Sequence, residues 1–489
     1  MNIATELREL AQARWPHRPA FHEGERTWTH AQVHDLAARA ATVLADRGVR
    51  PGTRVLVAVP DGIAWVTAFL ATARLGATAV LTNPALPVAD HDFIVADAGV
   101  SHVVAGEETA DRFAGLETLR DVELVAAARH APEGRAQPVG ADTPLYVQYT
   151  SGTTGRPKGV VHRHTDPSFY HAAFGRARLR LGPEDVTLSV SKLFFAYGFG
   201  NALVFPLFSG GSAVLTPERP GPGRVAELVR RHGVTAVYGV PSSYARLVGD
   251  TDPTDFASLR VAVSAGEKLS PAFAERFTGF LGVPVLDQLG STEAGHAMCA
   301  NGVDDNVAGT IGTPVPGFAL QVRDKHGDEV AVGEEGELWA RGPSVMPGYL
   351  GLPEETERTL VDGWLATRDR AVRNPDGTYT HLGRADDLEM VGGITMSPLE
   401  VEQVLGEHPG VRDVAVASIP DERGASRLRA FVVATTTAPD SQTLTTELLS
   451  LAGSRLAAFK VPRTVELVDV LPRTATGKIQ RFRVRQGTW

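Results

Sequence analysis

Tyr149–Gly159 read YTSGTTGRPKG, and this stretch decides the fold. It combines glycines, serine and threonine hydroxyls, and two cations. Just before it, Leu145, Val147 and Tyr149 alternate with other residues, which is typical of a half-buried strand. The stretch is therefore a loop that leaves a strand end, which is where open α/β sheets bind their ligands.

The loop has the chemistry of a phosphate cradle. Gly152 and Gly155 let the backbone turn tightly and bring its N–H groups close to an anion. The hydroxyls can donate to phosphate oxygens, and Arg156 or Lys158 can balance the charge. The pattern GxxxxGK[ST] cannot be laid on it, so it is not a Walker A loop. A flexible linker fits poorly, because an ordered Arg-Pro-Lys-Gly ending follows a clean strand.

Size and composition limit the class of protein. A chain of 489 residues is too long for one core, so we expect two or more domains. A hydrophobic content of 43% and a charged content of 21% are typical of soluble globular proteins. The net charge of −9 argues against a nucleic-acid-binding surface, which needs basic clusters.

The chain shows no sign of export or membrane insertion. Cys299 is the one cysteine, which rules out an internal disulfide and fits a reducing compartment. The N-terminal MNIATELREL lacks the apolar core of a secretory signal. Glycines and prolines interrupt the uncharged run Leu193–Pro217, so it is expected to line a buried pocket. We expect a cytoplasmic protein with no nucleic-acid or membrane partner.

The order of predicted elements indicates an α/β fold. A buried strand at Arg54–Val59, a helix at Ala64–Arg74 and a strand at Ala77–Leu81 form a βαβ unit, which favours a parallel sheet. The alternation continues to a strand at Val283–Gln288. From Gly309 the pattern changes to antiparallel strands. Beyond Gly383 it becomes smaller α+β units, so we place a domain boundary between 385 and 386.

Two further motifs carry polar groups at strand ends. Leu286–Glu293 (LDQLGSTE) runs from a strand into a turn, where Thr292 can bond a phosphate and Glu293 can hold Mg²⁺, which prefers hard oxygen ligands. Taken alone, the turn could equally be a helix N-terminus with capping residues. Gly363–Asp369 (GWLATRD) places one carboxylate where it suits the two hydroxyls of a ribose, although an isolated Asp is usually a solvated turn residue.

The loop TSGTTGRPKG resembles the phosphate loop of the adenylate-forming superfamily, which includes acyl-CoA synthetases, luciferases and the adenylation domains of peptide synthetases. The family's other motifs follow in order as far as Leu471–Arg481 (LPRTATGKIQR). The resemblance implies a large N-terminal domain, residues 1–385, with mixed and parallel sheets wrapped by helices and a β-rich subdomain. A small mobile α+β domain, residues 386–489, would follow.

The resemblance also implies roles for individual residues. The catalytic residues would be Lys158, Thr292, Glu293 and Lys478, with Glu293 holding Mg²⁺. The ATP and AMP contacts would be Thr150, Ser151, Gly152, Thr153, Thr154, Gly155, Ala265, Gly266, Glu267, Asp287, Gln288, Leu289, Gly290, Ser291, Asp369 and Arg384. Lys478 would bridge the carboxylate and the α-phosphate.

Other implied features concern the C-terminal domain. Asp386 would be the hinge, and Gly393 would let a pantetheine arm pass close to the backbone. The chain departs from the family pattern at two positions: Arg368 stands in a glycine slot, and Met390 stands where many members carry a lysine. We therefore expect a changed turn at Arg368 and assign no lysine role at Met390.

The segment Ser191–Asn201 (SKLFFAYGFGN) resembles the KLFFAYGLGN segment of benzoate–CoA ligases. By this resemblance an aryl group would be surrounded by Ala196, Tyr197, Ala265, Gly290, His296 and Ala297. Phe194 and Phe195 are expected to pack in the core. Benzoate ligases tend to have a larger aliphatic residue at the position of Ala297, so we expect a substituted or larger aryl acid.

The expected reaction has two half-steps. An aromatic carboxylate attacks Mg-ATP to give aryl-AMP and pyrophosphate, and the thiol of coenzyme A then displaces AMP. One alternative is an enzyme that loads a separate carrier protein; the chain ends at Trp489 without a carrier domain, which favours free coenzyme A. Another is a nucleotide-binding protein without turnover. The sequence leaves the oligomeric state open, with a homodimer among the options.

Overall fold

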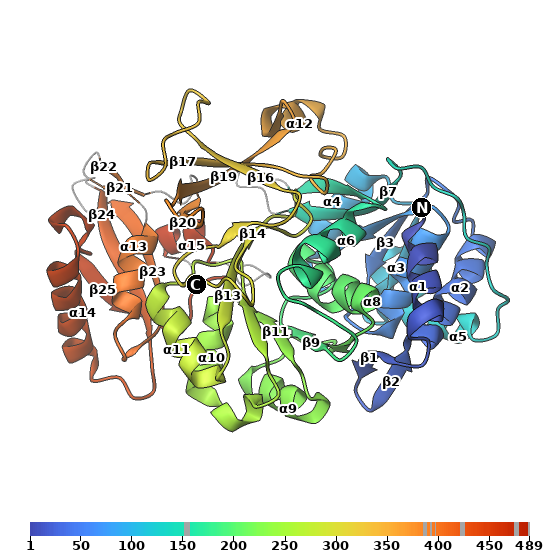
Figure 1. Ribbon diagram of the computed structural model, residues 1–489, viewed down its shortest axis with the longest axis horizontal. Helices are drawn as coiled ribbons and strands as arrows, with labels where there is room; N and C mark the ends of the chain where they lie inside the picture. The colour runs from blue at the N-terminus through green and yellow to red at the C-terminus, as the bar shows by residue number, and fades with distance from the viewer. Residues whose placement is uncertain are drawn as a thin grey trace.

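The computed structural model describes residues 1–150, 157–384, 389–391, 394–396, 398–420, 426–473 and 479–487. Within these ranges the chain forms two largely parallel sheets, an antiparallel sheet and a smaller C-terminal unit (Figure 1). The predicted α/β class, with a β-rich part and an α+β part after it, is confirmed. No helix in this part of the chain is both long and apolar enough to cross a bilayer.

The first sheet carries the predicted phosphate loop. Its order is β6–β5–β3–β4–β7–β8, and its strands are parallel except for β8, which is antiparallel to β7. The strands are β3 (Arg54–Ala58), β4 (Thr78–Leu81), β5 (His102–Ala105), β6 (Glu117–Arg120), β7 (Pro144–Thr150) and β8 (Lys158–Arg163). The accompanying helices are α1 (Ile3–Arg14), α2 (His30–Asp46), α3 (Ile63–Arg74), α4 (Val88–Ala98), η1 (Ala110–Phe113) and α5 (Asp121–Ala128).

The second sheet has the order β15–β14–β13–β12–β11–β9–β10–β1–β2. Its strands are β1 (Pro19–Glu23), β2 (Arg26–Thr29), β9 (Val186–Ser189), β10 (Ser212–Leu215), β11 (Ala236–Gly239), β12 (Val261–Ser264), β13 (Val285–Gly290), β14 (Ala297–Ala300) and β15 (Thr313–Pro314). Its helices are α9 (Pro222–His232), α10 (Pro241–Asp250), η4 (Pro253–Phe256) and α11 (Pro271–Leu281). Since β11, β12 and β13 are parallel, their carboxyl ends meet at one edge.

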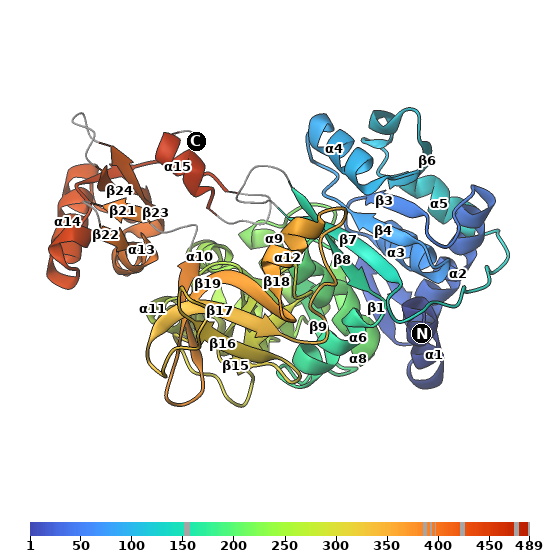
Figure 2. The same cartoon turned by 90° about the horizontal axis from the view of Figure 1, so that it is seen from above.

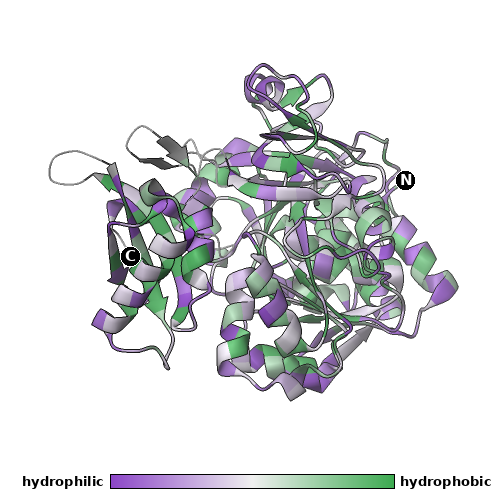
Figure 3. Ribbon diagram, turned by 60° about the vertical axis from the view of Figure 1, so that its left-hand side comes forward, coloured by the Kyte–Doolittle hydropathy of each residue, from purple (hydrophilic) through white to green (hydrophobic). Residues whose placement is uncertain are grey.

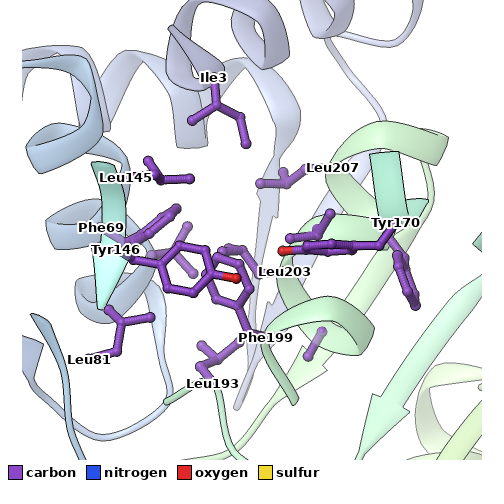
Figure 4. Close-up of a cluster of buried hydrophobic side chains, with 14 of the residues drawn as sticks. Ile3, Phe69, Leu81, Leu145, Tyr146, Tyr170, Leu193, Phe199, Leu203 and Leu207 are labelled. Carbon is purple, nitrogen blue, oxygen red and sulfur yellow. The ribbon is translucent and has the colours of Figure 1, made fainter. Parts of the chain in front are cut away.

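A short-helix segment links the two sheets. It comprises α6 (Asp166–Tyr170), the π-helical turn η2 (His171–Arg176), α7 (Ala196–Phe199), the π-helical turn η3 (Gly200–Val204) and α8 (Phe205–Ser209). Figure 4 shows Tyr146 of β7 beside Phe199 of α7 and Phe69 of α3. Because this packing fixes α7 against β7, the predicted aryl-binding segment is held next to the strand that leads into the phosphate loop.

The third sheet is the predicted β-rich part. Its order is β16–β17–β19–β18, and β20 also pairs with β19. It is built from β16 (Ala319–Arg323), β17 (Glu335–Arg341), α12 (Pro353–Thr359), β18 (Leu360–Val361), β19 (Trp364–Arg373) and β20 (Tyr379–Arg384). The pairing is antiparallel throughout, so the predicted strands at 319–322 and 336–340 are confirmed.

The C-terminal unit lies to one side of the other sheets (Figure 2). It contains β21 (Glu389–Val391), β22 (Ile394–Met396), α13 (Pro398–Gly406), β23 (Val411–Pro420), β24 (Ser426–Ala434), α14 (Ser441–Arg455), η6 (Ala458–Lys460), β25 (Thr464–Leu467) and α15 (Arg481–Gln486). The unit has its own apolar core between α13, α14 and the β23–β24–β25 sheet. Figure 3 shows green, hydrophobic stretches in this unit beside purple, hydrophilic ones. The predicted boundary at 385/386 lies outside the described residues and stays a prediction.

Candidate active site

Lys158 stands directly beside the predicted phosphate loop. Thr150 ends β7 and Lys158 begins β8, and the two residues are paired across the ladder. The loop residues Ser151–Gly155 lie outside the described residues, so their predicted contacts are untested. The register nevertheless brings Thr150 and Lys158 to the same end of the sheet.

The ammonium group of Lys158 has two partners that the sequence analysis did not name. It donates to Oε1 of Glu355 in α12, and both side chains are largely buried. It also lies 5.0 Å from the ring centroid of Tyr349. Arg358 donates to the other oxygen of Glu355 at 2.7 Å. These cations lower the pKa of the Glu355 carboxyl, with the Lys158 hydrogen bond as the main cause.

The turn after β13 carries Thr292 and Glu293, as predicted. The hydroxyl of Tyr349 donates to Oε1 of Glu293 at 3.0 Å. Because the same Tyr349 ring faces Lys158, a single tyrosine connects the predicted metal ligand to the predicted phosphate-binding cation. The structure thus brings Lys158 and Glu293 together, although they are far apart in the sequence.

The donor set fits a magnesium ion that arrives with ATP. Glu293 supplies a carboxylate and Thr292 a hydroxyl, both hard oxygen donors. Among the described residues, no group of three or more His, Cys, Asp or Glu side chains converges to hold a resident metal. Mg²⁺ commonly binds one or two carboxylates and completes its shell with phosphates and water, so one carboxylate is sufficient here.

Asp369, the predicted ribose contact, and Arg384, a predicted contact of the ribose or phosphate, are paired directly across β19 and β20. Asp369 is buried, and its Oδ1 lies 3.0 Å from Nε2 of His381. Its backbone N–H donates to the hydroxyl of Thr367. The structure therefore holds this carboxylate in place at a strand position, rather than leaving it in a solvated turn.

Arg368 sits in the left-handed region, with φ of 61°. A bulge interrupts the β17–β19 register at this point, between the pairs Glu337–Arg370 and Trp339–Ala366. Such a position favours glycine, which explains the glycine slot of the family pattern. The side chain of Arg368 lies 3.8 Å from Glu355, so this departure from the family pattern places a further cation beside the Lys158–Glu355 ion pair.

Substitution of Arg368 tests this backbone conformation. We expect Arg368→Gly to have a free energy of unfolding about 1–2 kcal/mol higher than Arg368→Val, because a β-branched residue is disfavoured at positive φ. Both variants lose the contact with Glu355, so their difference isolates the backbone effect. Urea unfolding measures it, and equal stability of the two variants would contradict the left-handed assignment.

The remaining predicted nucleotide contacts follow β12 and β13. Ala265, Gly266 and Glu267 come after β12, and Asp287–Ser291 span the end of β13 and the residue after it. Gly266 has φ of 83°, which a glycine accepts without strain. Burial raises the pKa of Asp287 well above its ordinary value. All these residues lie at the carboxyl edge of the second sheet, where a ligand is expected.

Glu267 joins this edge to the C-terminal unit. Its carboxylate accepts the backbone N–H of Ser242 at the start of α10 and is paired with Arg473. Arg473 also binds Asp413 of β23 at 2.7 Å. The sequence analysis predicted Glu267 as a nucleotide contact but did not predict this ion pair. The segment that leads from Arg473 to Lys478 therefore begins beside the predicted nucleotide site.

Tyr197 and His296 form one side of the predicted aryl slot. The Tyr197 hydroxyl donates to the carbonyl oxygen of Val263 at 3.0 Å. The ring of His296 lies 5.9 Å from that of Tyr197, and its Nε2 lies 3.2 Å from Oδ1 of Asn201. Burial lowers the pKa of His296 to about 3, so the imidazole is neutral. A Cβ at Gly200 would lie 2.3 Å from this ring, so the small residue there makes room for it.

The other predicted aryl contacts are at the adjacent strand ends. Ala297 begins β14 and pairs with Gly290 of β13, and both Ala297 and Ala265 are buried. A small cavity next to the slot is lined by Tyr197, Lys192, Arg219, Val240 and Phe195 among others. Phe194 is buried as predicted, but Phe195 is only partly buried and lines this cavity as well as contacting the core.

Some predictions lie outside the described residues. They concern Lys478, Asp386 and Gly393, in addition to the loop residues named above. Conversely, Tyr349, Glu355 and His381 were missed. They belong to no motif: Tyr349 and Glu355 reach the site through contacts between segments distant in sequence, and His381 through the pairing of β19 with β20.

Comparison with known proteins agrees with this geometry. The AMP-binding enzyme family matches residues 8–350, and the AMP-binding enzyme C-terminal domain matches residues 400–478. A p-hydroxybenzoic acid–AMP ligase, FadD22, from Mycobacterium tuberculosis strain H37Rv is 41% identical over 99% of this chain and 69% of its own length. A benzoate–CoA ligase from Thauera aromatica is 37% identical over 90% of this chain and 86% of its own length.

A solved structure is similar over the whole length. The anthranilate CoA ligase AuaEII in complex with anthranoyl-AMP matches with a TM-score of 0.95 and 32% identity, covering 100% of this chain and 97% of that one. The resemblance identified from the sequence motifs is thereby confirmed. This chain belongs to the AMP-binding enzyme family.

Proposed function

We propose that this chain is an AMP-forming acid–thiol ligase that activates an aromatic carboxylic acid and transfers it to coenzyme A. The observation that carries the proposal is that Lys158 and Glu293 meet at Tyr349, while Arg368, the neighbour of Asp369, reaches the Glu355 partner of Lys158. Contacts thus link the cationic, metal-binding and ribose-binding segments, and the Tyr197 hydroxyl binds the end of β12. The relatives with benzoate, hydroxybenzoate and anthranilate in their names support the aromatic acid.

Individual roles form part of the same proposal. Lys158 and Thr292 bind the phosphates of ATP, Glu293 holds the Mg²⁺ that accompanies it, and Asp369 and Arg384 hold the ribose. Lys478 neutralises the charge that grows as the carboxylate attacks the α-phosphate. The C-terminal domain then turns about Asp386 so that a thiol can approach along Gly393. The single cysteine supports a cytoplasmic location for this reaction.

A panel of acids tests the substrate class. We expect pyrophosphate release with Mg-ATP to depend on aromatic acids and to be highest with a hydroxy-, amino- or halobenzoate. Acetate and long-chain fatty acids are the matched negative substrates. A strict preference for either of these would overturn the aryl assignment, and no acid-dependent release with any substrate would favour a binding protein without turnover.

Ala297 is proposed to set the size of the aryl acid. We expect Ala297→Ile to lower kcat/KM for a substituted benzoate relative to benzoate by about 10-fold, since an added methylene or two in a tight slot changes discrimination by roughly that factor. Pyrophosphate release measures both substrates. The KM for ATP serves as the internal control, and an unchanged ratio between the two acids would contradict this role.

The acceptor could instead be a separate carrier protein. The relative with 41% identity is named an AMP ligase rather than a CoA ligase, and this chain spans 69% of its length. Turnover with coenzyme A, compared with turnover on phosphopantetheinylated carrier proteins, distinguishes the two. Higher kcat/KM with a carrier protein would replace coenzyme A in the proposal and leave the adenylation step unchanged.

A further inference from the structure

A buried histidine lies behind the turn that carries Thr292 and Glu293. His162 of β8 is 0% exposed. Its Nε2 lies 2.7 Å from the carbonyl oxygen of Thr292, and its Nδ1 lies 3.1 Å from Oδ2 of Asp166. Neither His162 nor Asp166 belongs to the motifs discussed above. The contact connects the strand that begins at Lys158 to the turn that follows β13.

The hydrogen-bond partners account for the buried polar atoms of this pair. Nε2 of His162 donates to the Thr292 carbonyl, because a carbonyl oxygen can only accept, and Nδ1 shares a hydrogen bond with the Asp166 carboxyl. Asp166 is 1% exposed and also accepts the backbone N–H of Arg163 at 2.9 Å and its Nε–H at 3.2 Å. Both side chains are thus hydrogen-bonded, as buried polar groups must be.

Neighbouring rings and the turn itself restrict the imidazole. Tyr146 stacks on it, with ring centroids 4.9 Å apart and an angle of 28° between the planes. On the other side, Gly295 has φ of 82°, and a Cβ there would lie 3.3 Å from Cε1 of His162. The Thr292 carbonyl also accepts the N–H of Gly295 at 3.0 Å, which closes the turn. This hydrogen bond and the close approach of Gly295 therefore hold the Thr292–Gly295 turn against the imidazole of His162.

We propose that His162 and Asp166 are positioning residues for adenylate formation, fixing the Thr292 carbonyl so that the Thr292 hydroxyl and the Glu293 carboxylate are aimed at Mg-ATP. This inference rests on the proposed function. Burying a hydrogen-bonded polar pair costs desolvation free energy, and well-packed apolar side chains of similar volume are often as stable or more so. The pair instead fixes an orientation. Because the His162 ring is held between the Asp166 carboxyl and the Thr292 carbonyl, its N–H holds that carbonyl in one orientation.

Conservative variants separate positioning from folding. In Asp166→Asn the imidazole loses its carboxylate partner, and in His162→Phe the ring keeps its stacking on Tyr146 but loses both hydrogen bonds. We expect the dissociation constant of Mg-ATP, measured by calorimetry on the full chain, to rise about 10-fold to 100-fold, as with partners that orient metal ligands. The KM for the aryl acid should stay within about twofold, because the predicted aryl slot is formed by residues other than the turn that His162 contacts.

His162→Gln should recover part of the loss, because its amide N–H can still donate to the Thr292 carbonyl. The matched control is His30→Gln: His30 is also 0% exposed, and its Nε2 lies 3.0 Å from the carbonyl oxygen of Gly211, away from the site. It should lower the melting temperature without changing Mg-ATP binding. Melting curves of all variants identify those that fold, and His162→Gln is the variant to use if His162→Phe does not.

The outcomes are distinct. Folded Asp166→Asn and His162→Gln proteins that bind Mg-ATP within twofold of wild type would overturn the inference. An equal rise in the dissociation constant of Mg-ATP in the His30→Gln control would also overturn it. If the wild-type protein releases no pyrophosphate with any acid but binds Mg-ATP, the proposed function fails while the binding comparison still decides the role of His162 and Asp166.

Discussion

Lys478→Ala is expected to lower aryl-adenylate formation by two or more orders of magnitude, about what the loss of one preorganised charge at the reacting centre costs. Lys478 itself lies outside the described residues. Arg473, five residues earlier in the chain, is paired with Glu267 at the nucleotide edge. Acid-dependent pyrophosphate release measures the adenylation step.

The second half-reaction is the control for this prediction. Thioester formation from added aryl-AMP and coenzyme A should survive in Lys478→Ala, because the proposed rotation takes the lysine away before the thiol attacks. Lys460→Ala, which removes a lysine paired with Glu400 elsewhere in the C-terminal unit, should affect neither step. Equal loss of both half-reactions in Lys478→Ala would argue against the rotation.

Arg481→Met is expected to destabilise the C-terminal unit by about 3–5 kcal/mol, the usual effect of leaving one partner of a buried ion pair without the other. Arg481 and Glu402 form two hydrogen bonds, of 2.6 and 2.9 Å, and are 7% and 8% exposed. Glu402 also accepts the backbone N–H of Val416 in β23. The pair thus ties α15 and α13 to strand β23 of the unit.

Hydrogen exchange of the β23 and β24 amides reports the local free energy of opening. Arg455→Met is the matched control, since Arg455 pairs with Glu407 in the same unit but its side chain is 53% exposed; exposed pairs contribute about 0–1 kcal/mol. The double variant Arg481→Met with Glu402→Leu should recover much of the loss. If Arg481→Met exchanges as slowly as the Arg455→Met protein, the buried pair does not stabilise the unit.

Local sequence patterns were sufficient for most elements. The alternating strand before Tyr149 and the βαβ unit at 54–81 appear where periodicity placed them. The hairpin of β1 and β2 was missed, because its short strands pair at the edge of the second sheet with β10, more than 180 residues away. Short edge strands take their stability from that distant pairing rather than from their own pattern.

The candidate site likewise has residues that the sequence predicted and residues that it did not. Motifs predicted Lys158, Thr292, Glu293, Asp369 and Arg384, because phosphate, metal and ribose chemistry needs particular side chains at strand ends. They did not predict what holds these groups. The partners Tyr349, Glu355 and His381 come from segments without a motif, and only the tertiary fold brings them within hydrogen-bonding distance.

The sequence by itself determined the family, the alternation of most strands and helices along the chain, and the chemical groups available for ATP and an aromatic acid, because these depend on residue type and local spacing. Only the tertiary structure decided that Tyr349 links Lys158 to Glu293, that Arg473 reaches Glu267, and that a buried His162–Asp166 pair lies behind Thr292. The physical reason is that hydrogen bonds and ion pairs act over about 3–4 Å, and the fold alone sets which distant residues come that close.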